Sequence, residues 1–331
     1  MSRKSVIAGI VVALAIVGAA ELLTRRLASN SVPRQRIRVI VSAPKSIDVL
    51  GMGNSLMAAG FDPAAFEEKW AKAGRSCTAV NGALGATGPI EHLALTRLAY
   101  RGHSVAILVY GFFDQQLASN VAVKNSEIIG NHSMLYYLEP ELTLRYAGFD
   151  LCDRLLFRAY SSLALLRERG AIWAKVERLR RTMASVGTPG EQTNQFGRAA
   201  DFALLEANDS RAFRLSCERV IRSNQFLSAP VAALFRQALQ QGSMVVVVEM
   251  PMHPEHIKRF YDQPIWADFR TKTRQYVERT GASYLNASTW IQDKSMFEDH
   301  LHLSAAGAHD FSQRLAEYLL ANPTGLLSPD G

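Results

Sequence analysis

The 331-residue sequence is poor in cysteine and contains only Cys77, Cys152 and Cys217. No two of them stand at the short spacing of a zinc finger or a dithiol redox motif, so the sequence predicts neither kind of site. An odd count also excludes a framework in which every thiol is paired within the chain. We therefore interpret all three as small buried hydrophobic residues.

Net charge is absent from most of the chain. The formal charge is +7, and residues 1–46 account for all of it, with eight basic residues against Glu21 alone. Residues 47–331 are balanced, which argues against nucleic acid as a partner because nucleic-acid-binding surfaces are strongly basic. The basic excess flanks an apolar segment, so we expect a membrane surface as the partner instead.

Phosphate-binding fingerprints are also lacking. Gly82, Gly85 and Gly88 do not have the G-x-G-x-x-G spacing of a dinucleotide site or its downstream acidic residue. Asp299 and its neighbours His300 and His302 are potential metal ligands, but no second cluster stands at ligand spacing. We therefore expect neither a metal nor an organic cofactor.

One long apolar run is present, at residues 5–23, and Glu21 is its only charged residue. About 20 residues span a bilayer, and the basic residues Arg3 and Lys4 precede the run as in a signal sequence or signal anchor. Cleavage after Ala20 is the alternative. We expect an uncleaved anchor that places the folded domain outside the cytoplasm, in the periplasm if the cell is Gram-negative.

Strand-like and helix-like segments alternate from residue 47, with one interruption. Strands are predicted at 47–52, 77–84, 105–110, 244–249 and 283–286, and helices at 63–72, 89–100, 230–241, 266–280 and 304–320. This alternation predicts an α/β fold with a parallel sheet flanked by helices. Between residues 120 and 228 the alternation stops, and the composition favours helices.

These patterns divide the chain into six segments. They are a membrane anchor or signal segment (1–24), a basic tether (25–46), the first part of the α/β domain (47–119), a large helical insertion (120–228), the second part of the α/β domain (229–322) and a tail (323–331). Within the insertion, residues 154–181 hold eight basic and two acidic residues. That stretch is either a basic amphipathic helix on a membrane or anionic polymer, or a solvated helix with one buried stripe, which is the simpler interpretation.

Two motifs far apart in the sequence carry candidate chemistry. Ser55 follows the first predicted strand within Gly53-Asn54-Ser55-Leu56, and open α/β sheets bind ligands at the carboxyl ends of their strands. Asp299 and His302 stand three residues apart, so that the carboxylate can hold the ring while its other nitrogen faces a serine hydroxyl. The pattern predicts Ser55 as nucleophile, His302 as base and Asp299 as orienting group. A helix-capping turn is the alternative interpretation of Asp299 and His302.

The ordered motifs resemble the SGNH, or GDSL, hydrolase superfamily. Residues 53–56 resemble its first block, Gly85-x-Thr87 its second, Gly111-x-x-Asp114 its third and Asp299-x-x-His302 its fifth. The resemblance covers residues 47–115 and 230–320. It implies a three-layer SGNH-like sheet, an acyl-enzyme on Ser55 and an oxyanion hole that includes the Gly85 amide.

Phe113 stands where the superfamily has an asparagine that donates a hydrogen bond to the oxyanion. Losing one such donor typically costs about 100- to 1000-fold in rate. Three alternatives follow. The backbone amides of Ser55 and Gly85 are enough to stabilise the oxyanion, or the side chain of Asn81 or Asn54 supplies the missing donor, or the catalytic activity is weak or lost.

Asp114 and His253 complete the predicted substrate-binding residues, together with Phe113. Both follow apolar strands, so they are expected at the ligand-binding edge of the sheet. The alternative for His253 is that it only stabilises the turn between Pro251 and Pro254.

The expected function is a serine-dependent acyl-ester hydrolase or O-acyltransferase at the outer face of the membrane. The resemblance implies a cell-envelope carbohydrate or ester as substrate, since membrane-tethered relatives include proteins that acetylate envelope polysaccharides. The expected partners are an acyl donor, the membrane through residues 5–23 and a membrane-bound acyltransferase. The alternative, motivated by Phe113, is a catalytically weak or inactive SGNH-fold binding or assembly protein of the cell envelope.

Overall fold

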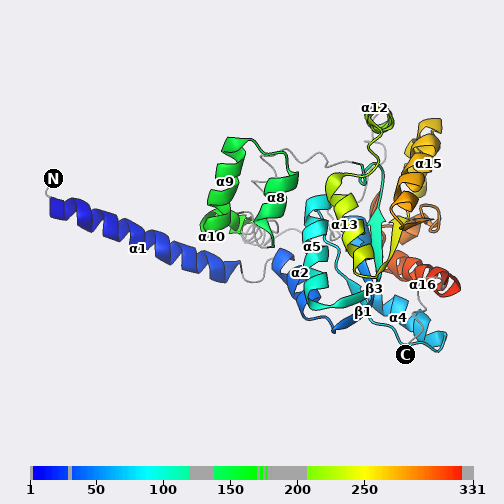
Figure 1. Ribbon diagram of the computed structural model, residues 1–331, viewed down its shortest axis with the longest axis horizontal. Helices are drawn as coiled ribbons and strands as arrows, with labels where there is room; N and C mark the ends of the chain where they lie inside the picture. The colour runs from blue at the N-terminus through cyan, green and yellow to red at the C-terminus, as the bar shows by residue number, and fades with distance from the viewer. Residues whose placement is uncertain are drawn as a thin grey trace. The chain divides into compact units, whose positions relative to one another are not determined.

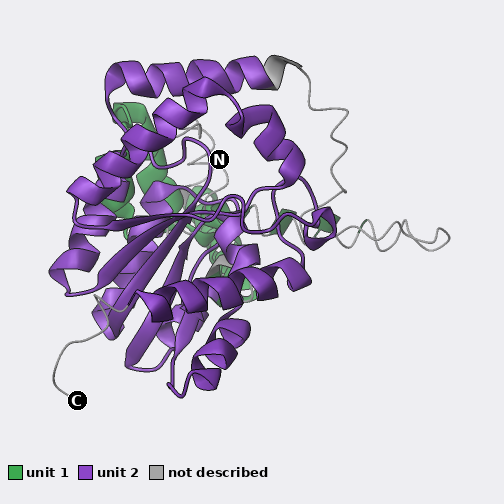
Figure 2. Ribbon diagram, turned by 90° about the vertical axis from the view of Figure 1, so that its right-hand side faces the viewer, with its two compact units in different colours: residues 1–35, 123–191 green, residues 36–122, 192–331 purple. Residues whose placement is uncertain are grey.

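The computed structural model describes residues 3–28, 32–118, 138–169 and 207–322, together with single positions between 172 and 180. It divides into two compact units (Figure 2), one of residues 1–35 and 123–191 and the other of residues 36–122 and 192–331. The larger unit contains the sheet, and the smaller unit contains the apolar N-terminal helix.

The larger unit is built on a five-stranded parallel sheet in the order β2-β1-β3-β4-β5. The strands are β1 (Ser46–Gly53), β2 (Ala79–Asn81), β3 (Ser104–Phe112), β4 (Met244–Glu249) and β5 (Ser283–Asn286). The helices of this unit are α3 (Ser55–Gly60), α4 (Pro63–Lys72), α5 (Pro89–Gly102), α12 (Ala207–Ser223), α13 (Ala229–Gln240), α14 (Pro254–His256), the π-helix η2 (Ile257–Tyr261), α15 (Pro264–Arg279), the 3-10 helix η3 (Lys294–Met296) and α16 (Ala305–Ala321). Figure 1 shows α5 and α13 on one side of the sheet and α4 and α16 on the other, which confirms the predicted three-layer α/β architecture.

The central strands are continuous apolar runs that helices cover on both faces. The inner residues of β3 and β4 are buried, as is typical of parallel strands enclosed between two helical layers. In register, Val109 of β3 lies between Gly51 of β1 and Val246 of β4. The predicted bounds of β4 and β5 are confirmed.

Strand β2 is shorter than the predicted 77–84. The Asn81 side-chain oxygen accepts a hydrogen bond from the Ala83 N–H at 3.1 Å. A side chain that bonds the backbone two residues on closes a local turn, which takes the place of further ladder pairing. The chain therefore leaves the sheet at Asn81 and enters the glycine-rich loop.

Local capping sets where the helices flanking the sheet begin. Helix α4 starts at Pro63 because the Asp62 carboxylate accepts from the N–H groups of Ala64 and Ala65, at 3.0 and 3.3 Å. Helix α16 starts after Ser304, whose hydroxyl accepts from the Gly307 N–H at 3.3 Å. Both starts agree with the sequence prediction.

Gly307 of α16 lies close to the backbone of another segment. A Cβ at this position would overlap the carbonyl of Met296, in the segment that leads to His302. We expect Gly307→Ala to lower the free energy of unfolding by about 1–3 kcal/mol, because the overlap can be relieved only by moving backbone. Urea denaturation followed by tryptophan fluorescence measures the loss.

Gly102→Ala is the matched control for that substitution. Gly102 ends α5 and has no atom within 4 Å of the position its Cβ would take. The substitution should leave the free energy of unfolding unchanged or raise it by up to about 1 kcal/mol, because alanine lowers the conformational entropy of the unfolded chain. Equal unfolding midpoints for the two variants would contradict the close packing at Gly307.

The smaller unit comprises α1 (Arg3–Leu27), α8 (Pro140–Tyr146), α9 (Leu151–Ser162) and α10 (Ala164–Arg167). The Glu21 carboxylate of α1 accepts from the N–H groups of Ala164 and Leu165 at 2.7 and 2.9 Å. The first N–H groups of a helix have no acceptor within that helix, so the Glu21 carboxylate caps α10 and links it to the end of α1. In the stretch 4–27, α1 is long and apolar enough to cross a membrane, a property that membrane anchors and signal sequences share.

The segment boundaries differ from the sequence prediction at two places. Residues 32–41 of the predicted tether form helix α2 (Val32–Val41), in which Ile40 is fully buried. Helix α12 of the predicted insertion belongs to the larger unit, where the Phe213 ring packs against Phe260 and Trp266 at 5.2 and 5.4 Å. The buried Ile40 side chain thus explains why residues 32–41 are ordered, and Phe213 explains why α12 packs on the core of the larger unit. Residues 119–137, 181–206 and the predicted tail 323–331 lie outside the described residues.

Candidate active site

Ser55 is the first residue of α3 and stands immediately beyond the carboxyl end of β1. Gly53 has φ +146°, and a Cβ there would lie 2.5 Å from the Gly111 carbonyl oxygen, so only glycine fits at this bend. The Asn54 side-chain oxygen then accepts from the Leu56 N–H at 2.9 Å and caps the helix. The local sequence thus places Ser55 at the edge of the sheet where α/β proteins bind ligands.

Gly85 lies directly against Ser55. A Cβ built on Gly85 would be 3.5 Å from the Ser55 Cβ. The loop that carries Gly85 is held to β1, because the Gly82 N–H donates to the Gly51 carbonyl at 2.8 Å and the Leu84 N–H to the Gly53 carbonyl at 3.3 Å. The backbone of Gly85 is therefore positioned beside the candidate nucleophile, as the expected oxyanion role requires.

Asp299 and His302 form a close carboxylate–imidazole pair. His302 Nδ1 lies 2.8 Å from Asp299 Oδ2 and 3.0 Å from Oδ1. The same carboxylate accepts from the backbone N–H groups of Leu301 and His302, at 2.8 and 2.7 Å. With Nδ1 facing the carboxylate, Nε2 is the basic nitrogen of the ring.

The environment of Asp299 keeps it ionised. Burial alone would raise its pKa, but the hydrogen bonds from the His302 ring and from the two backbone N–H groups outweigh burial and lower the pKa to about 2. A depressed carboxyl pKa contributes stability above the unfolded value of about 3.9, and this contribution is lost as the pH falls through about 2. At neutral pH Asp299 is therefore a fixed negative charge next to the imidazole.

The loop that carries His302 packs beside helix α3. Leu303 lies against Gly60, where an added Cβ would be 3.4 Å from Leu303 Cδ1. Ser312 joins α16 to the turn between α3 and α4, since its hydroxyl donates to the Gly60 carbonyl at 3.3 Å and accepts from the Asp62 N–H at 2.8 Å. Leu303, the residue after His302, thus lies against the C-terminal end of the helix that begins with Ser55.

Asn81 has a different role from the expected oxyanion donor. Its Nδ2 lies within hydrogen-bond distance of three carbonyl oxygens at the end of α3, those of Met57 (3.3 Å), Ala58 (3.2 Å) and Phe61 (2.7 Å). An amide nitrogen has only two hydrogens to donate, so these carbonyls occupy both. Asn81 therefore holds the end of the helix that begins with the candidate nucleophile, and its amide hydrogens are not available to an oxyanion.

Asn54 is also committed to the framework. Its oxygen caps α3, and its Nδ2 donates to Gln116 Oε1 at 2.9 Å. This bond links the turn after β1 to the segment after β3. Asn54 thus helps to hold the turn that carries Ser55, and one of the two hydrogens of its Nδ2 is used in doing so.

The segment after β3 places Phe113 and Asp114 in different surroundings. Phe113 is half-buried and packs against the main hydrophobic core. Asp114 has φ +47°, and its N–H donates to the Tyr261 hydroxyl oxygen at 3.1 Å. Its Oδ1 lies 3.1 Å from His256 Nε2. Asp114, a predicted substrate-binding residue, is thus engaged in a second carboxylate–imidazole pair.

His256 is a candidate functional residue that the sequence did not single out. It is buried, and its ring packs against Phe260 and Tyr261 at 4.7 and 5.3 Å. Its Nδ1 has no hydrogen-bond partner in the part of the chain that the structure describes. Its position three residues after His253, following the β4 strand, is the one sequence signal that would have directed attention to it.

His253 lies after β4, as predicted, and takes part in a turn. Its Nδ1 accepts from the Glu255 N–H at 3.1 Å, and its ring packs against Phe297 at 5.2 Å. Burial and the charge of Lys294 lower its pKa. The hydrogen bond matches the turn-stabilising alternative, and the contact with Phe297 joins β4 to the loop that leads to Asp299.

Among residues 3–28, 32–118, 138–169 and 207–322, no group of three histidine, cysteine, aspartate or glutamate side chains is arranged to hold an ion. The Asp299 carboxylate is instead committed to the His302 ring and two backbone N–H groups.

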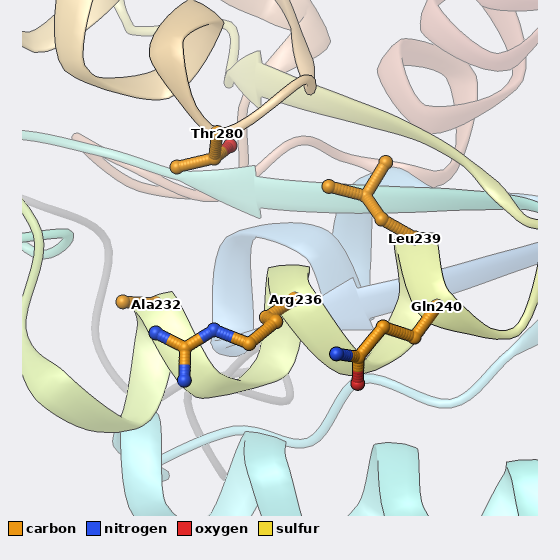
Figure 3. A pocket seen from close by; sticks show the side chains of 5 residues that line it. All are labelled: Ala232, Arg236, Leu239, Gln240 and Thr280. Carbon is orange, nitrogen blue, oxygen red and sulfur yellow. The ribbon is translucent and has the colours of Figure 1, made fainter.

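A separate open pocket of about 420 Å³ lies on the surface of α13 and the turn before β5 (Figure 3). Its lining residues are Ala232, Arg236, Leu239, Gln240 and Thr280. Gln240 and Thr280 precede β4 and β5, so this end of the pocket is at the amino edge of the sheet. The candidate active site occupies the carboxyl edge.

Comparisons with known proteins find similarity only among solved structures. No protein-family model matches the sequence, and no curated protein matches it. The crystal structure of TesA matches with a TM-score of 0.39 and 13% identity, over 85% of this chain and 99% of that one. A lipase/acylhydrolase from Enterococcus faecalis matches with a TM-score of 0.35 and 10% identity, over 86% and 100% of the two chains.

Proposed function

We propose that this protein belongs to the SGNH hydrolase superfamily and transfers acyl groups through an ester on Ser55. The observation that carries the proposal is the Asp299–His302 pair, held at 2.8 Å on a loop that packs beside the helix beginning with Ser55. Gly85 lies against the same serine. A nucleophile, a base and an oriented carboxylate are the components of a serine acyl-transfer site.

The first half-reaction forms the acyl-enzyme. A serine hydroxyl is a weak nucleophile by itself, so His302 Nε2 takes the proton as Ser55 Oγ attacks the carbonyl carbon of the donor ester. Asp299 stabilises the imidazolium that results. The tetrahedral intermediate collapses, the bond to the leaving oxygen breaks, and His302 returns the proton to that oxygen.

The second half-reaction repeats the proton transfers with an acceptor. His302 takes a proton from water or from a sugar hydroxyl, which attacks the acyl carbon, and returns it to Ser55 Oγ as the ester bond breaks. The product is a free acid when water attacks and a new ester when a sugar attacks. Exclusion of water decides between hydrolysis and O-acyl transfer.

Two backbone amides are proposed as the oxyanion donors, those of Ser55 and Gly85. The hydrogen bonds of Asn81 and Asn54 support this choice, because both side chains are engaged with the framework around α3. Phe113 cannot donate and offers an apolar surface instead. An apolar wall beside the acyl-enzyme favours transfer over hydrolysis, since it keeps water away from the acyl group.

The proposed setting is the outer face of a membrane, with α1 retained as the anchor. The apolar stretch 4–27 and its contact with α10 through Glu21 support retention. The substrates would be an acyl donor and a carbohydrate or small ester of the cell envelope, and a membrane-bound acyltransferase would be the partner that supplies the acyl group. Phe113 favours a second candidate, a binding or assembly protein on the same fold.

Labelling by a fluorophosphonate probe tests the proposal. The full-length wild-type protein should be labelled, and Ser55→Ala should abolish the label. Ser295→Ala is the matched control, because this exposed serine lies in η3, before the Asp299 loop, and its hydroxyl donates to Asp293 at 2.8 Å. A folded wild-type protein that resists labelling would instead identify a binding protein.

Phe113→Asn tests the oxyanion hole. Supplying a side-chain donor should raise ester hydrolysis, by up to about 100-fold if the new donor is well placed, and should lower the ratio of transfer to hydrolysis. Phe113→Leu is the control, because it retains an apolar side chain and adds no donor. Both products are measured from one acyl donor. If hydrolysis is unchanged in the asparagine variant, Phe113 does not stand at the oxyanion position.

A further inference from the structure

Helix α9 of the smaller unit turns an apolar face to solvent. Leu151, Leu155 and Leu156 have 72%, 61% and 46% of their surface exposed, whereas Phe157 is fully buried. At 3.6 residues per turn, these leucines lie on the side of the helix opposite Phe157. Cys152, expected to be buried, is exposed on the same side. We refer to Leu151, Cys152, Leu155 and Leu156 as the apolar face of α9.

The opposite side of α9 already forms the core of the smaller unit. The Phe157 ring packs against Phe149 at 5.5 Å, and Ala164 at the start of α10 is fully buried. The apolar face therefore has no part in holding α9 to this core. A contiguous exposed apolar surface of this kind is typical of an interaction site.

The smaller unit joins α9 to the candidate membrane helix. Leu163 alone separates α9 from α10, whose first amides are capped by Glu21 near the end of α1. Figure 1 shows α9 running across the direction of α1. If α1 crosses a bilayer, a helix held in this direction at its end lies along the membrane surface.

Basic residues border the apolar face. Arg154 and Arg158 lie on α9, next to the leucines on one edge, and both are exposed. Arg169, which follows α10, lies over the ring of Tyr160 on α9. Elsewhere in the smaller unit, Arg25 and Arg26 stand in the last turn of α1. An apolar face edged by arginine is the pattern of helices that lie in the interface of membranes containing anionic lipids.

We propose that α9 docks on the surface of the membrane that α1 crosses, with its leucines at the boundary of the acyl chains and the arginines at the level of anionic phosphates. The occupant of the apolar face is thus lipid. The proposal rests on retention of α1, which is part of the proposed function, and it does not depend on the chemistry of Ser55.

The test uses Cys152 as a native reporter on the apolar face. Cys77 and Cys217 react slowly at neutral pH, because burial raises the pKa of their thiols to about 12 and about 11. The full-length protein is labelled with a nitroxide and reconstituted into vesicles of phosphatidylcholine with phosphatidylglycerol. If Cys152 lies in the membrane interface, the nitroxide should be accessible to oxygen, which dissolves among the acyl chains, and should be protected from a nickel complex that stays in water.

Charged substitutions and lipid composition supply the controls. Leu151→Asp combined with Leu155→Asp should remove the protection, and vesicles of phosphatidylcholine alone should weaken it. Leu215→Asp is the matched control, because Leu215 is a 46% exposed leucine on α12 of the larger unit. It should leave the protection unchanged.

Three outcomes would overturn the proposal. One is a nitroxide on Cys152 that is fully accessible to the nickel complex although carbonate extraction leaves the protein in the membrane. Another is protection that appears only when a second membrane protein is added, which would assign the apolar face to a protein. The third is a mature N-terminus after Ala20. Fluorophosphonate labelling in the same vesicles reports on Ser55 independently, so failure of the chemistry and failure of docking are distinguishable.

Discussion

Ser55→Ala and His302→Ala are each expected to lower the acyl-transfer rate by roughly 10⁶-fold, because nucleophile and base act as one unit. The double variant should be no worse than either single variant. Single-turnover measurement with an activated ester and the full-length protein gives the rate of acylation directly. Unchanged unfolding midpoints in both variants would show that the loss is chemical.

Asp299→Asn should cost less, about 10⁴-fold, through the wrong tautomer of His302. The carboxylate accepts from Nδ1 at 2.8 Å and stays ionised down to a pH of about 2, so it fixes the ring throughout the neutral range. Ser295→Ala, which alters only an exposed turn, should retain the full rate. A turnover in the Ser55 variant close to that of the wild type would remove the serine from the mechanism.

The largest expected effect on stability is at the buried ion pair between β4 and α15. Glu249 is fully buried, and Arg270 donates to both of its oxygens at 2.7 and 2.8 Å. Tyr284 donates to the same carboxylate. Arg270→Leu should lower the free energy of unfolding by about 3–5 kcal/mol, because it leaves a buried carboxylate without its countercharge.

Two further variants separate loss of the ion pair from loss of packing. The double variant Glu249→Leu with Arg270→Leu should recover much of the stability, since no charge then remains buried. Arg274→Ala breaks an exposed pair with Glu278 on the same helix, 2.7 Å apart, and should leave the free energy of unfolding nearly unchanged, because water screens the pair. Equal losses for Arg270→Leu and Arg274→Ala in urea denaturation would contradict the assigned role of Glu249.

Local patterns were sufficient to predict much of the fold. The valine run at 244–249 and the cap at Asp62 depend on neighbours within a few residues, and the structure has both as predicted. The pairing of His302 with Asp299 is also local, because the two residues share one turn. The sequence therefore identified the candidate base and its orienting group without knowledge of the tertiary structure.

The roles that could not be predicted depend on contacts between distant segments. Asp114 and His256 pair across 142 residues, and no spacing in the sequence encodes that contact. Asn81 was expected at the oxyanion, yet its amide is used by carbonyl groups of α3, which lie 20 to 24 residues earlier. In each case the polar group bonds the partner that the packing of the sheet brings to it.

The contact between Glu21 and α10 has a consequence for the order of folding. The two sides are separated by 143 residues, and three of the five strands of the sheet are encoded between them. During synthesis α1 emerges first, and its carboxylate has to wait until residues 164 and 165 have left the ribosome before the cap can form. Closing so long a loop is entropically costly and slow. The smaller unit is therefore expected to be completed only after β1, β2 and β3 have been made.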